Sequence, residues 1–487
     1  MRLVLTFEID CLVTRGGGLQ AVSVMFPFGS IPLPILRRAR WPLQTPSFMI
    51  DKILPGYAAI DIGQEKIFIA CGGDCQVRSF CTFSGDLQLA AAHLKQHGVS
   101  KVAMEATGVY WIPIHDLLQS QGLEVTVFNG AHARNMPGRK SDVLDCQWHA
   151  MLHSHGLLTP CFIPTDEIRQ LRCFYRLRDD HLAIGASHIQ HMQRALDLMN
   201  VRLHTVISQI HGVSGLRVIK ALLAGQRDPV ALSELCDMMI LKHKRQEVIK
   251  SLEGDWREHH LFALRQALEG YEFCLGQAAA CDKEIEALLK RINQGKPPAS
   301  RDPKVKVKPI RHNAPEISDL HGLLLTMTDG RDATRLPGFT ALGFMKLLGE
   351  TGTDLSRWPT FKHFTSWARL APGSNQSGKK RKRTRRGKTV VGQIFREAVL
   401  SLARSKYVAL GAVYRRIKAR RGPAVAVTAI ARKLAELYYK LMTKGLDYVE
   451  KGIETYETQY KEQTLRYLKK TAGKLGFSLT PATQNPE

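Results

Sequence analysis

The sequence predicts an α/β domain in its N-terminal third, then a helical middle region and a mainly α-helical C-terminal domain. Three observations lead to this division. Short apolar runs separated by turn residues fill residues 57–83 and then alternate with helical patterns as far as residue 155. A heptad-like repeat covers residues 168–196. Residues 294–313 hold four prolines among basic residues, as a linker does, so we place a domain boundary there.

The N-terminal domain, residues 51–158, is expected to follow the order β-β-β-α-β-α-β-α. The apolar runs predict strands at residues 57–63, 66–71, 77–83, 102–105 and 123–128. The helical patterns predict helices at about residues 87–96, 110–119 and 141–155. A three-stranded meander followed by alternating helices and strands is the ribonuclease-H-like arrangement.

Four carboxylates in this domain occupy informative places. Asp61 lies in the middle of the first strand, where an acid is costly unless it is paired or binds a metal. Glu105 ends the fourth strand, and Asp142 and Asp145 point the same way from the start of the last helix. An acidic first turn that favours the helix dipole would explain Asp142 and Asp145 alone. It does not explain Asp61 and Glu105, so we interpret all four as one site.

Four such carboxylates can bind two Mg²⁺ ions about 4 Å apart, the arrangement used for in-line displacement at a phosphodiester. One ion would activate the attacking oxygen, and the other would stabilise the leaving oxygen. Arg139 and Lys140 directly precede the Asp142–Asp145 pair and are expected to contact nucleic acid.

Charge and composition point to the same class of partner. The net charge is +25 and the sequence pI is about 9.7, which favours a polyanion, with nucleic acid first. A membrane surface is the second candidate, but no window approaches about 20 uninterrupted apolar residues. The ten cysteines include no CxxC pair, which is typical of buried thiols in a reducing cytosol. We therefore expect a cytoplasmic protein that binds no membrane.

Residues 1–50 differ from the rest of the chain. The apolar stretch at residues 26–36 contains three prolines, and its basic residues follow it, whereas a signal peptide has its charge first. We expect a poorly ordered extension, with Met49 as an alternative start.

The middle region, residues 159–293, is expected to be helical. Ile168, Tyr175, Leu182, Ile189 and Leu196 recur every seven residues, and a second helical stretch covers about residues 241–292. The repeat fits an antiparallel or dimeric coiled coil, and it equally fits an amphipathic helix packed within the same chain. The linker that follows is placed at residues 294–316.

The C-terminal domain is placed at residues 317–455, with a tail at residues 456–487. Residues 335–349 resemble a helix-hairpin-helix, in which backbone N–H groups at a Gly-containing turn meet a DNA phosphate, although Thr340 replaces the second glycine. Further helices are expected at about residues 358–370, 390–403 and 424–441.

A basic run lies inside this C-terminal domain. Residues 379–421 contain sixteen Lys and Arg and one acid, Glu397, which gives +15 of the net +25. A solvated or nuclear-targeting tail is the alternative, but the run leads into apolar helices, and a basic stripe in a folded domain more often contacts phosphates. The residues expected to bind nucleic acid here are Lys379, Lys380, Arg381, Lys382, Arg383, Arg385, Arg386 and Lys388.

Several of these stretches resemble a known family. The N-terminal ones are residues 60–63 (IDIG), 104–111 (MEATGVYW) and 138–145 (GRKSDVLD). The C-terminal ones are residues 336–339 (LPGF), 364–372, 377–378 (SG) and 385–388 (RRGK). Together they resemble transposases of the insertion-sequence family numbered one hundred and ten. The DEDD domain of that family is similar to the Holliday-junction resolvase RuvC, and the resemblance covers about residues 57–452.

The resemblance implies a DNA transposase or recombinase with two cooperating sites. The carboxylate quartet would bind Mg²⁺, and a serine of the second domain would attack the DNA phosphate and form a covalent intermediate. Ser377 fits the position of that serine, with Ser374 as the alternative; either hydroxyl needs activation to become a good nucleophile. The resemblance also implies double-stranded donor and target DNA, a structured guide RNA from the same element, and a homo-oligomer, dimeric or higher.

Two other functions fit the residues. One is a metal-dependent, junction-selective endonuclease that works without a covalent step. The other is a non-catalytic DNA-binding remnant of a transposase, against which the presence of all four carboxylates argues.

Overall fold

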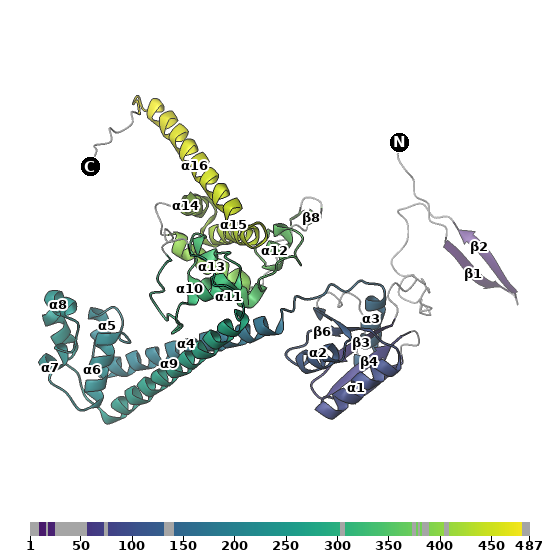
Figure 1. The fold of residues 1–487 in the computed structure, drawn as a ribbon, viewed down its shortest axis with the longest axis horizontal. Coiled ribbons are helices and arrows are strands. Elements are labelled where there is room, and N and C mark those ends of the chain that lie inside the picture. The colour runs from purple at the N-terminus through teal and green to yellow at the C-terminus, as the bar shows by residue number, and fades with distance from the viewer. Residues whose placement is uncertain are drawn as a thin grey trace. The chain divides into compact units, whose positions relative to one another are not determined.

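The computed structural model describes residues 9–15, 18–24, 56–72, 76–130, 141–301, 307–372, 376–377, 380–381, 389–403 and 409–479. The chain divides into two compact units, Met1–Phe162 and Ile163–Glu487 (Figure 1). Among the described residues, none of the helices has the length and apolar character needed to cross a membrane.

The first unit is built on a five-stranded mixed sheet in the order β5-β4-β3-β6-β7. Its strands are β3 (Tyr57–Ile62), β4 (Lys66–Cys71), β5 (Val77–Cys81), β6 (Lys101–Glu105) and β7 (Glu124–Phe128). β3 and β4 pair antiparallel, as do β4 and β5, whereas β3, β6 and β7 run parallel. The first three strands therefore form the predicted meander, and the later two extend the sheet in parallel.

The helices of this unit are α1 (Ser84–Gln96), α2 (Trp111–Ser120) and α3 (Asp142–Ser154). From β3 onward, the elements follow the predicted order β-β-β-α-β-α-β-α. This mixed sheet is compatible with a ribonuclease-H-like domain. Within the first fifty residues, the part that the structure describes is an antiparallel strand pair, β1 (Ile9–Arg15) with β2 (Gly18–Val24).

Side chains of β3 alternate between the two faces of the sheet, as the pleat requires. Ala58 and Ile60 point to one face and are fully buried. Tyr57 and Ala59 point to the other and join a core with Cys146 and Ala150 of α3. α3 therefore covers the face to which odd-numbered residues of β3 point, and Asp61 is one of these.

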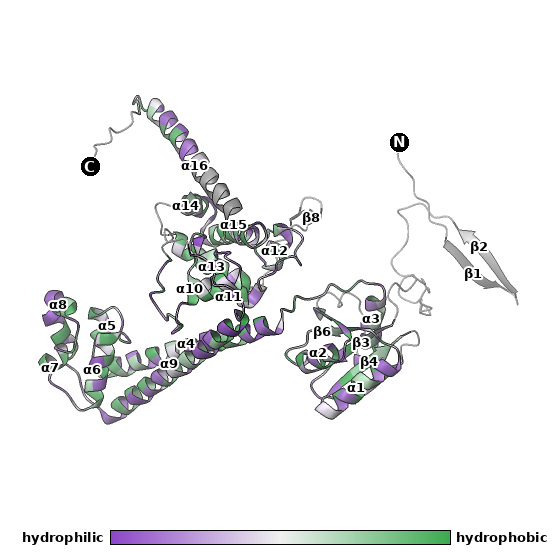
Figure 2. Ribbon diagram, viewed as in Figure 1, coloured by the Kyte–Doolittle hydropathy of each residue, from purple (hydrophilic) through white to green (hydrophobic). Residues whose placement is uncertain are grey.

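The second unit contains a long antiparallel helix pair, α4 (Asp166–Leu198) and α9 (Glu258–Ile292). Gln170 near the start of α4 accepts a hydrogen bond from Arg291 near the end of α9, at 2.6 Å. Polar and apolar residues alternate along both helices (Figure 2). Within the described structure, the predicted repeat thus packs against a second helix of the same chain.

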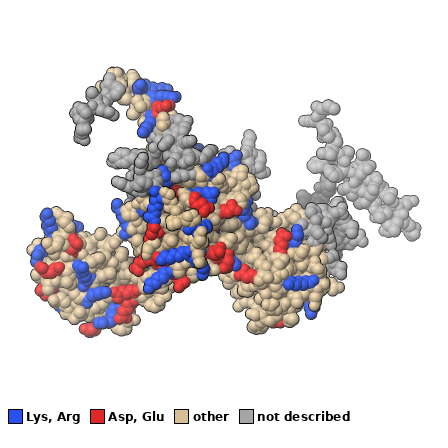
Figure 3. All heavy atoms as spheres, in the orientation of Figure 1, with Lys and Arg blue, Asp and Glu red and all other residues tan. Residues whose placement is uncertain are grey.

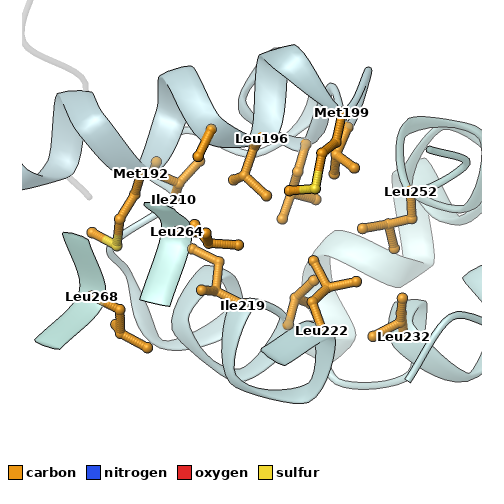
Figure 4. Close-up of a cluster of buried hydrophobic side chains, with 14 of the residues drawn as sticks. Met192, Leu196, Met199, Ile210, Ile219, Leu222, Leu232, Leu252, Leu264 and Leu268 are labelled. Carbon is orange, nitrogen blue, oxygen red and sulfur yellow. The ribbon is translucent and has the colours of Figure 1, made fainter. Parts of the chain in front are cut away.

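Four shorter helices lie between the C-terminal end of α4 and the N-terminal end of α9. They are α5 (Leu203–Val206), α6 (Val213–Leu223), α7 (Pro229–Ser233) and α8 (Met238–Ser251). Together these elements enclose a cluster of apolar side chains, which we call the tip core (Figure 4). The helical stretch predicted at about residues 241–292 corresponds to two helices, α8 and α9, separated at residues 252–257. The tip core includes Met192, Leu196, Met199, Ile210, Ile219, Leu222, Leu232, Leu252, Leu264 and Leu268.

The C-terminal part of the second unit is mainly α-helical. The predicted helices at 358–370, 390–403 and 424–441 correspond to α12 (Phe361–Trp367), α13 (Val390–Ala403) and α15 (Pro423–Lys444). α16 extends to Lys474, into the stretch that the sequence assigns to a tail. The other elements are α10 (Leu320–Met327), η3 (Ala333–Arg335), α11 (Ala341–Thr351), β8 (Gln376–Ser377), β9 (Lys380–Arg381), α14 (Ala409–Arg421) and α16 (Leu446–Lys474).

Buried polar contacts join α11 to α4. The Glu350 carboxylate accepts hydrogen bonds from the Tyr175 hydroxyl and from Arg176, whose Nη2 lies at 2.6 Å. Arg172 donates to the backbone oxygens of Gly349 and Glu350 at 3.0 and 2.8 Å. These contacts hold the end of α11 on α4, so the C-terminal helices and the long helix pair pack as one unit.

A buried ion pair joins α4 to α9. Arg178 and Asp282 are 2.6 Å apart and almost fully buried. Arg178 also donates to the backbone oxygen of Asn313 at 3.0 Å, and Asp282 accepts from the backbone N–H of Glu316 at 3.0 Å. The end of the predicted linker is therefore tied to the helix pair.

Candidate active site

Two of the predicted carboxylates meet because β3 and β6 are parallel neighbours. Ile60 of β3 lies opposite Met104 of β6, so the next residues, Asp61 and Glu105, end up side by side on the face that α3 covers. Both side chains are partly exposed. The sheet register, rather than any local motif, brings these two acids together.

Contacts along α3 place its first turn near the end of β3. The Ser141 hydroxyl caps the helix by accepting from the Leu144 N–H at 3.4 Å. The Cys146 thiol donates to the Phe68 carbonyl of β4 at 3.1 Å, and His153 Nδ1 donates to the Ala58 carbonyl of β3 at 3.1 Å. Asp142 and Asp145 lie in the first turn of this fixed helix.

The four carboxylates interact electrostatically at Asp61. Burial, followed by the negative charges of Asp142, Glu105 and Asp145 in that order, raises the pKa of Asp61 to about 6. A carboxyl group titrating this close to neutrality among other acids is typical of a functional site. All four residues predicted from the sequence therefore contribute to one negative region.

His149 of α3 also belongs to this region, and the sequence interpretation missed it. Ligand atoms of Asp61, Glu105 and His149 all lie within 4.8 Å of one another, and His149 Nε2 is 3.9 Å from Glu105 Oε2. Among the described residues, this tight group does not include Asp142 or Asp145. A signal was present, because positions 142, 145 and 149 share one face of a helix.

Gly130 packs directly against Glu105. A Cβ atom built on Gly130 would overlap the Glu105 carboxylate, so any larger residue would displace one or the other. Gly130 follows β7, the strand that pairs with β6. The absence of a side chain at Gly130 thus leaves the space that the Glu105 carboxylate occupies.

These residues fit a divalent metal ion. Carboxylate oxygens are the ligands that Mg²⁺ and Mn²⁺ prefer, and imidazole nitrogen is a common ligand of transition metals. Like charges that raise the pKa of Asp61 would be balanced by a cation between them. The site can therefore hold a divalent metal ion.

The second predicted site lies in the C-terminal part. Ser377 ends the short strand β8 and pairs with Lys380 of β9, while Gln376 pairs with Arg381. The side chains of these four residues are not described, and the other residues predicted here or beside the quartet lie outside the described residues. Those are Arg139, Lys140, Ser374, Lys379, Lys382, Arg383, Arg385, Arg386 and Lys388.

Basic residues that the structure does describe continue toward α14. The exposed ones near the end of this helix are Arg415, Arg416, Lys418, Arg420 and Arg421. Lys and Arg side chains form scattered groups on the visible face of the described residues, with Asp and Glu among them (Figure 3). Part of the predicted basic run is therefore on an ordered, accessible helix.

Two family models match the chain, and both describe transposases. Residues 58–201 match a model of DEDD transposases of the IS110 type, and residues 331–415 match one described as the transposase IS116/IS110/IS902 family. The chain is therefore a DNA transposase or recombinase. Both matches point to the IS110 type of insertion-sequence transposases, which the sequence motifs predicted. No curated protein matches the chain in sequence.

The matched segments cover both predicted sites. The first contains the four carboxylates and His149, and its DEDD type implies dependence on a divalent metal. The second contains Ser377 and the helix-hairpin-helix-like stretch, where Thr340 caps α11 by accepting from the Gly343 N–H at 3.2 Å.

Proposed function

We propose that this transposase cuts and rejoins double-stranded DNA with a Mg²⁺-binding quartet, Asp61, Glu105, Asp142 and Asp145, and a serine nucleophile, Ser377. The observation that carries the proposal is the convergence of three carboxylate charges on Asp61 within the segment that matches DEDD transposases. Two bound ions fit four carboxylates, as in other enzymes of phosphodiester chemistry.

A bound divalent ion would supply charge neutralisation at the scissile phosphate and would favour ionisation of an attacking oxygen. The four carboxylates of this chain would bind the ion and so fix the position of its positive charge. Asp61 and Glu105 are anchored by neighbouring strands, while Asp142 and Asp145 come from a helix start fixed by the Ser141 cap. Because strands and a packed helix present these groups, their positions are set before substrate binds.

The covalent step assigned to Ser377 is a transfer of the phosphodiester. The Ser377 Oγ–P bond forms, the bond from phosphorus to the sugar oxygen of the DNA breaks, and the serine proton passes to a base. The freed sugar oxygen takes up a proton. Rejoining reverses the step with a different DNA end, so the energy of the original phosphodiester is retained.

The basic run supports binding of more than one nucleic acid. A net charge of +25 is compatible with double-stranded donor and target DNA together with a structured guide RNA. The resemblance to this family implies a guide RNA, and we propose that this chain uses one. Purifying the protein from its host and sequencing the bound RNA tests it, since absence of enriched RNA from the element's flanks contradicts RNA guidance.

The nucleophile is tested with the full chain and labelled DNA that spans an end of the element. We expect wild-type protein to give a DNA adduct that survives denaturation, and Ser377→Ala to lose it at least about 1,000-fold. Ser374→Ala is the matched control and should retain the adduct. An adduct lost only in Ser374→Ala would move the nucleophile to that residue.

The endonuclease alternative gives a different pattern in the same assay. Cutting of DNA junctions that requires Asp61 and Mg²⁺ but is unchanged in Ser377→Ala would establish a nuclease without a covalent step. Unchanged cutting in Asp145→Asn would contradict the quartet itself.

A further inference from the structure

We propose that His149 is an additional metal ligand of this site and that it shifts the preference of the site from Mg²⁺ toward Mn²⁺. This inference rests on the proposed metal function of the quartet. It concerns a residue outside the four acids, and it assigns a property, ion selectivity, that the acids alone do not give.

The first support is geometric. His149 Nε2 lies 3.9 Å from Glu105 Oε2, which is too long for a hydrogen bond between these two atoms. Two ligands about 2.1 Å from a shared ion lie roughly 3 Å apart when adjacent and about 4.2 Å apart when opposite. The separation therefore fits two groups that share an ion, and Asp61 completes the set within 4.8 Å.

The second support is the fixed orientation of the imidazole. The side chain of His149 is only 5% exposed, and its ring packs edge-to-face with that of Phe128, with centroids 4.9 Å apart. Phe128 lies opposite Glu105 in the pairing of β6 with β7 and is itself fully buried. Packing thus holds the imidazole beside the carboxylate.

A second buried histidine on α3 shows that burial alone does not produce this arrangement. His153 lies one turn further along the helix, and its Nδ1 bonds to the Ala58 carbonyl at 3.1 Å. Its role there is explained by packing of the helix on β3. His149 instead faces the acids, which makes His153 a matched control for loss of a buried imidazole.

The third support is the chemistry of the donor. Mg²⁺ strongly prefers oxygen ligands, whereas later divalent metals accept imidazole nitrogen more readily. A neutral nitrogen in place of an oxygen therefore weakens Mg²⁺ binding relative to Mn²⁺. A site with four carboxylates and one imidazole remains able to bind either ion, with a larger margin in favour of Mn²⁺.

The test uses the full chain loaded with one equivalent of Mn²⁺, which serves as a paramagnetic probe. Pulsed electron paramagnetic resonance should detect ¹⁴N coupling from a coordinated imidazole in the wild-type protein and in His153→Gln. The coupling should disappear in His149→Gln. The proposal would be overturned if the wild-type protein bound Mn²⁺ without ¹⁴N coupling, at a site that Asp61→Asn abolishes. This outcome can be observed without any variant at position 149.

Calorimetric titrations with Mn²⁺ and Mg²⁺ give the second readout. We expect His149→Gln to weaken Mn²⁺ binding at least about tenfold and Mg²⁺ binding clearly less. Equal losses for both ions, or no loss, would contradict a role in selectivity. If Asp61→Asn also leaves Mn²⁺ binding unchanged, the metal function proposed for the quartet fails as well, which separates the two failures.

Discussion

Acidic side chains are removed from water in both units, but they are treated in opposite ways. In the second unit, Asp282 is buried against Arg178, and Glu350 is buried against Arg176 and Tyr175. In the first unit, burial and the charges of three other carboxylates together raise the pKa of Asp61 to about 6. Buried carboxylates are thus neutralised by basic partners in the second unit, whereas in the first unit they lie close to other carboxylates.

The difference separates a structural from a functional use of charge. A buried acid that meets an arginine fixes how two helices pack, and removing either partner leaves an uncompensated charge. Clustered acids repel one another and destabilise the protein until a cation binds among them, so their role is functional: they bind that cation. Three substitutions test this contrast.

Removing Arg178 should produce the largest loss of stability. Arg178→Met leaves the buried Asp282 without its partner, and we expect the free energy of unfolding of the second unit to fall by about 3–5 kcal/mol. Urea unfolding followed by circular dichroism measures it. Lys220→Met is the control, since Lys220 pairs with Glu272 at an exposed position and should cost less than about 1 kcal/mol. Equal effects of the two substitutions would refute the contrast.

Enlarging Gly130 should disturb the crowded site without changing its charge. In Gly130→Ala the new methyl group overlaps the Glu105 carboxylate, so we expect a loss of about 1–3 kcal/mol in stability and weaker Mn²⁺ binding. Calorimetry measures both properties. Gly85→Ala is the control, because a Cβ at Gly85 would meet no atom within 4 Å. Unchanged metal binding in Gly130→Ala would show that the position of Glu105 is not limiting.

Neutralising Asp61 should stabilise the metal-free protein, in a way that depends on pH. The folded protein retains the Asp61 proton up to about pH 6, whereas the unfolded chain loses it near pH 3.8, so the ionised group opposes folding above pH 6. We expect Asp61→Asn to gain about 1–2 kcal/mol at pH 8, after allowance for solvent screening, and nothing below pH 4. Hydrogen exchange of β3 amides in the presence of a chelator measures this gain. A gain that is the same at pH 4 and pH 8 would be inconsistent with crowding of charge.

Much of the first unit could be predicted from the sequence because its signals are local. The apolar run at residues 66–71 is β4 to the residue, and the helix predicted from residue 141 begins at Asp142. Asp61 was identifiable because an acid inside an apolar strand is energetically costly unless it is paired or binds a metal. In the second unit, a local pattern of apolar residues likewise predicted the helix at residues 390–403, which is α13.

Other features depend on distances along the chain that no local pattern encodes. His149 by itself is indistinguishable from a core histidine, and only the docking of α3 on β3 and β4 places it beside Glu105. Gly130 faces Glu105 because β7 pairs with β6. Glu350 meets Arg176 across 174 positions of sequence, so its compensation was not predictable.

The long helix pair has a consequence for synthesis of the chain. About sixty residues separate the end of α4 at Leu198 from the start of α9 at Glu258. At about 5–20 residues per second, α4 emerges from the ribosome roughly 3–12 seconds before α9 begins to follow it. The short helices α5–α8 are made during this delay, and they supply part of the core around Met192, Leu196 and Met199 at the C-terminal end of α4. The start of α9 supplies Leu264 and Leu268 to the tip core, so α9 joins contacts already begun by its own chain when it packs along α4.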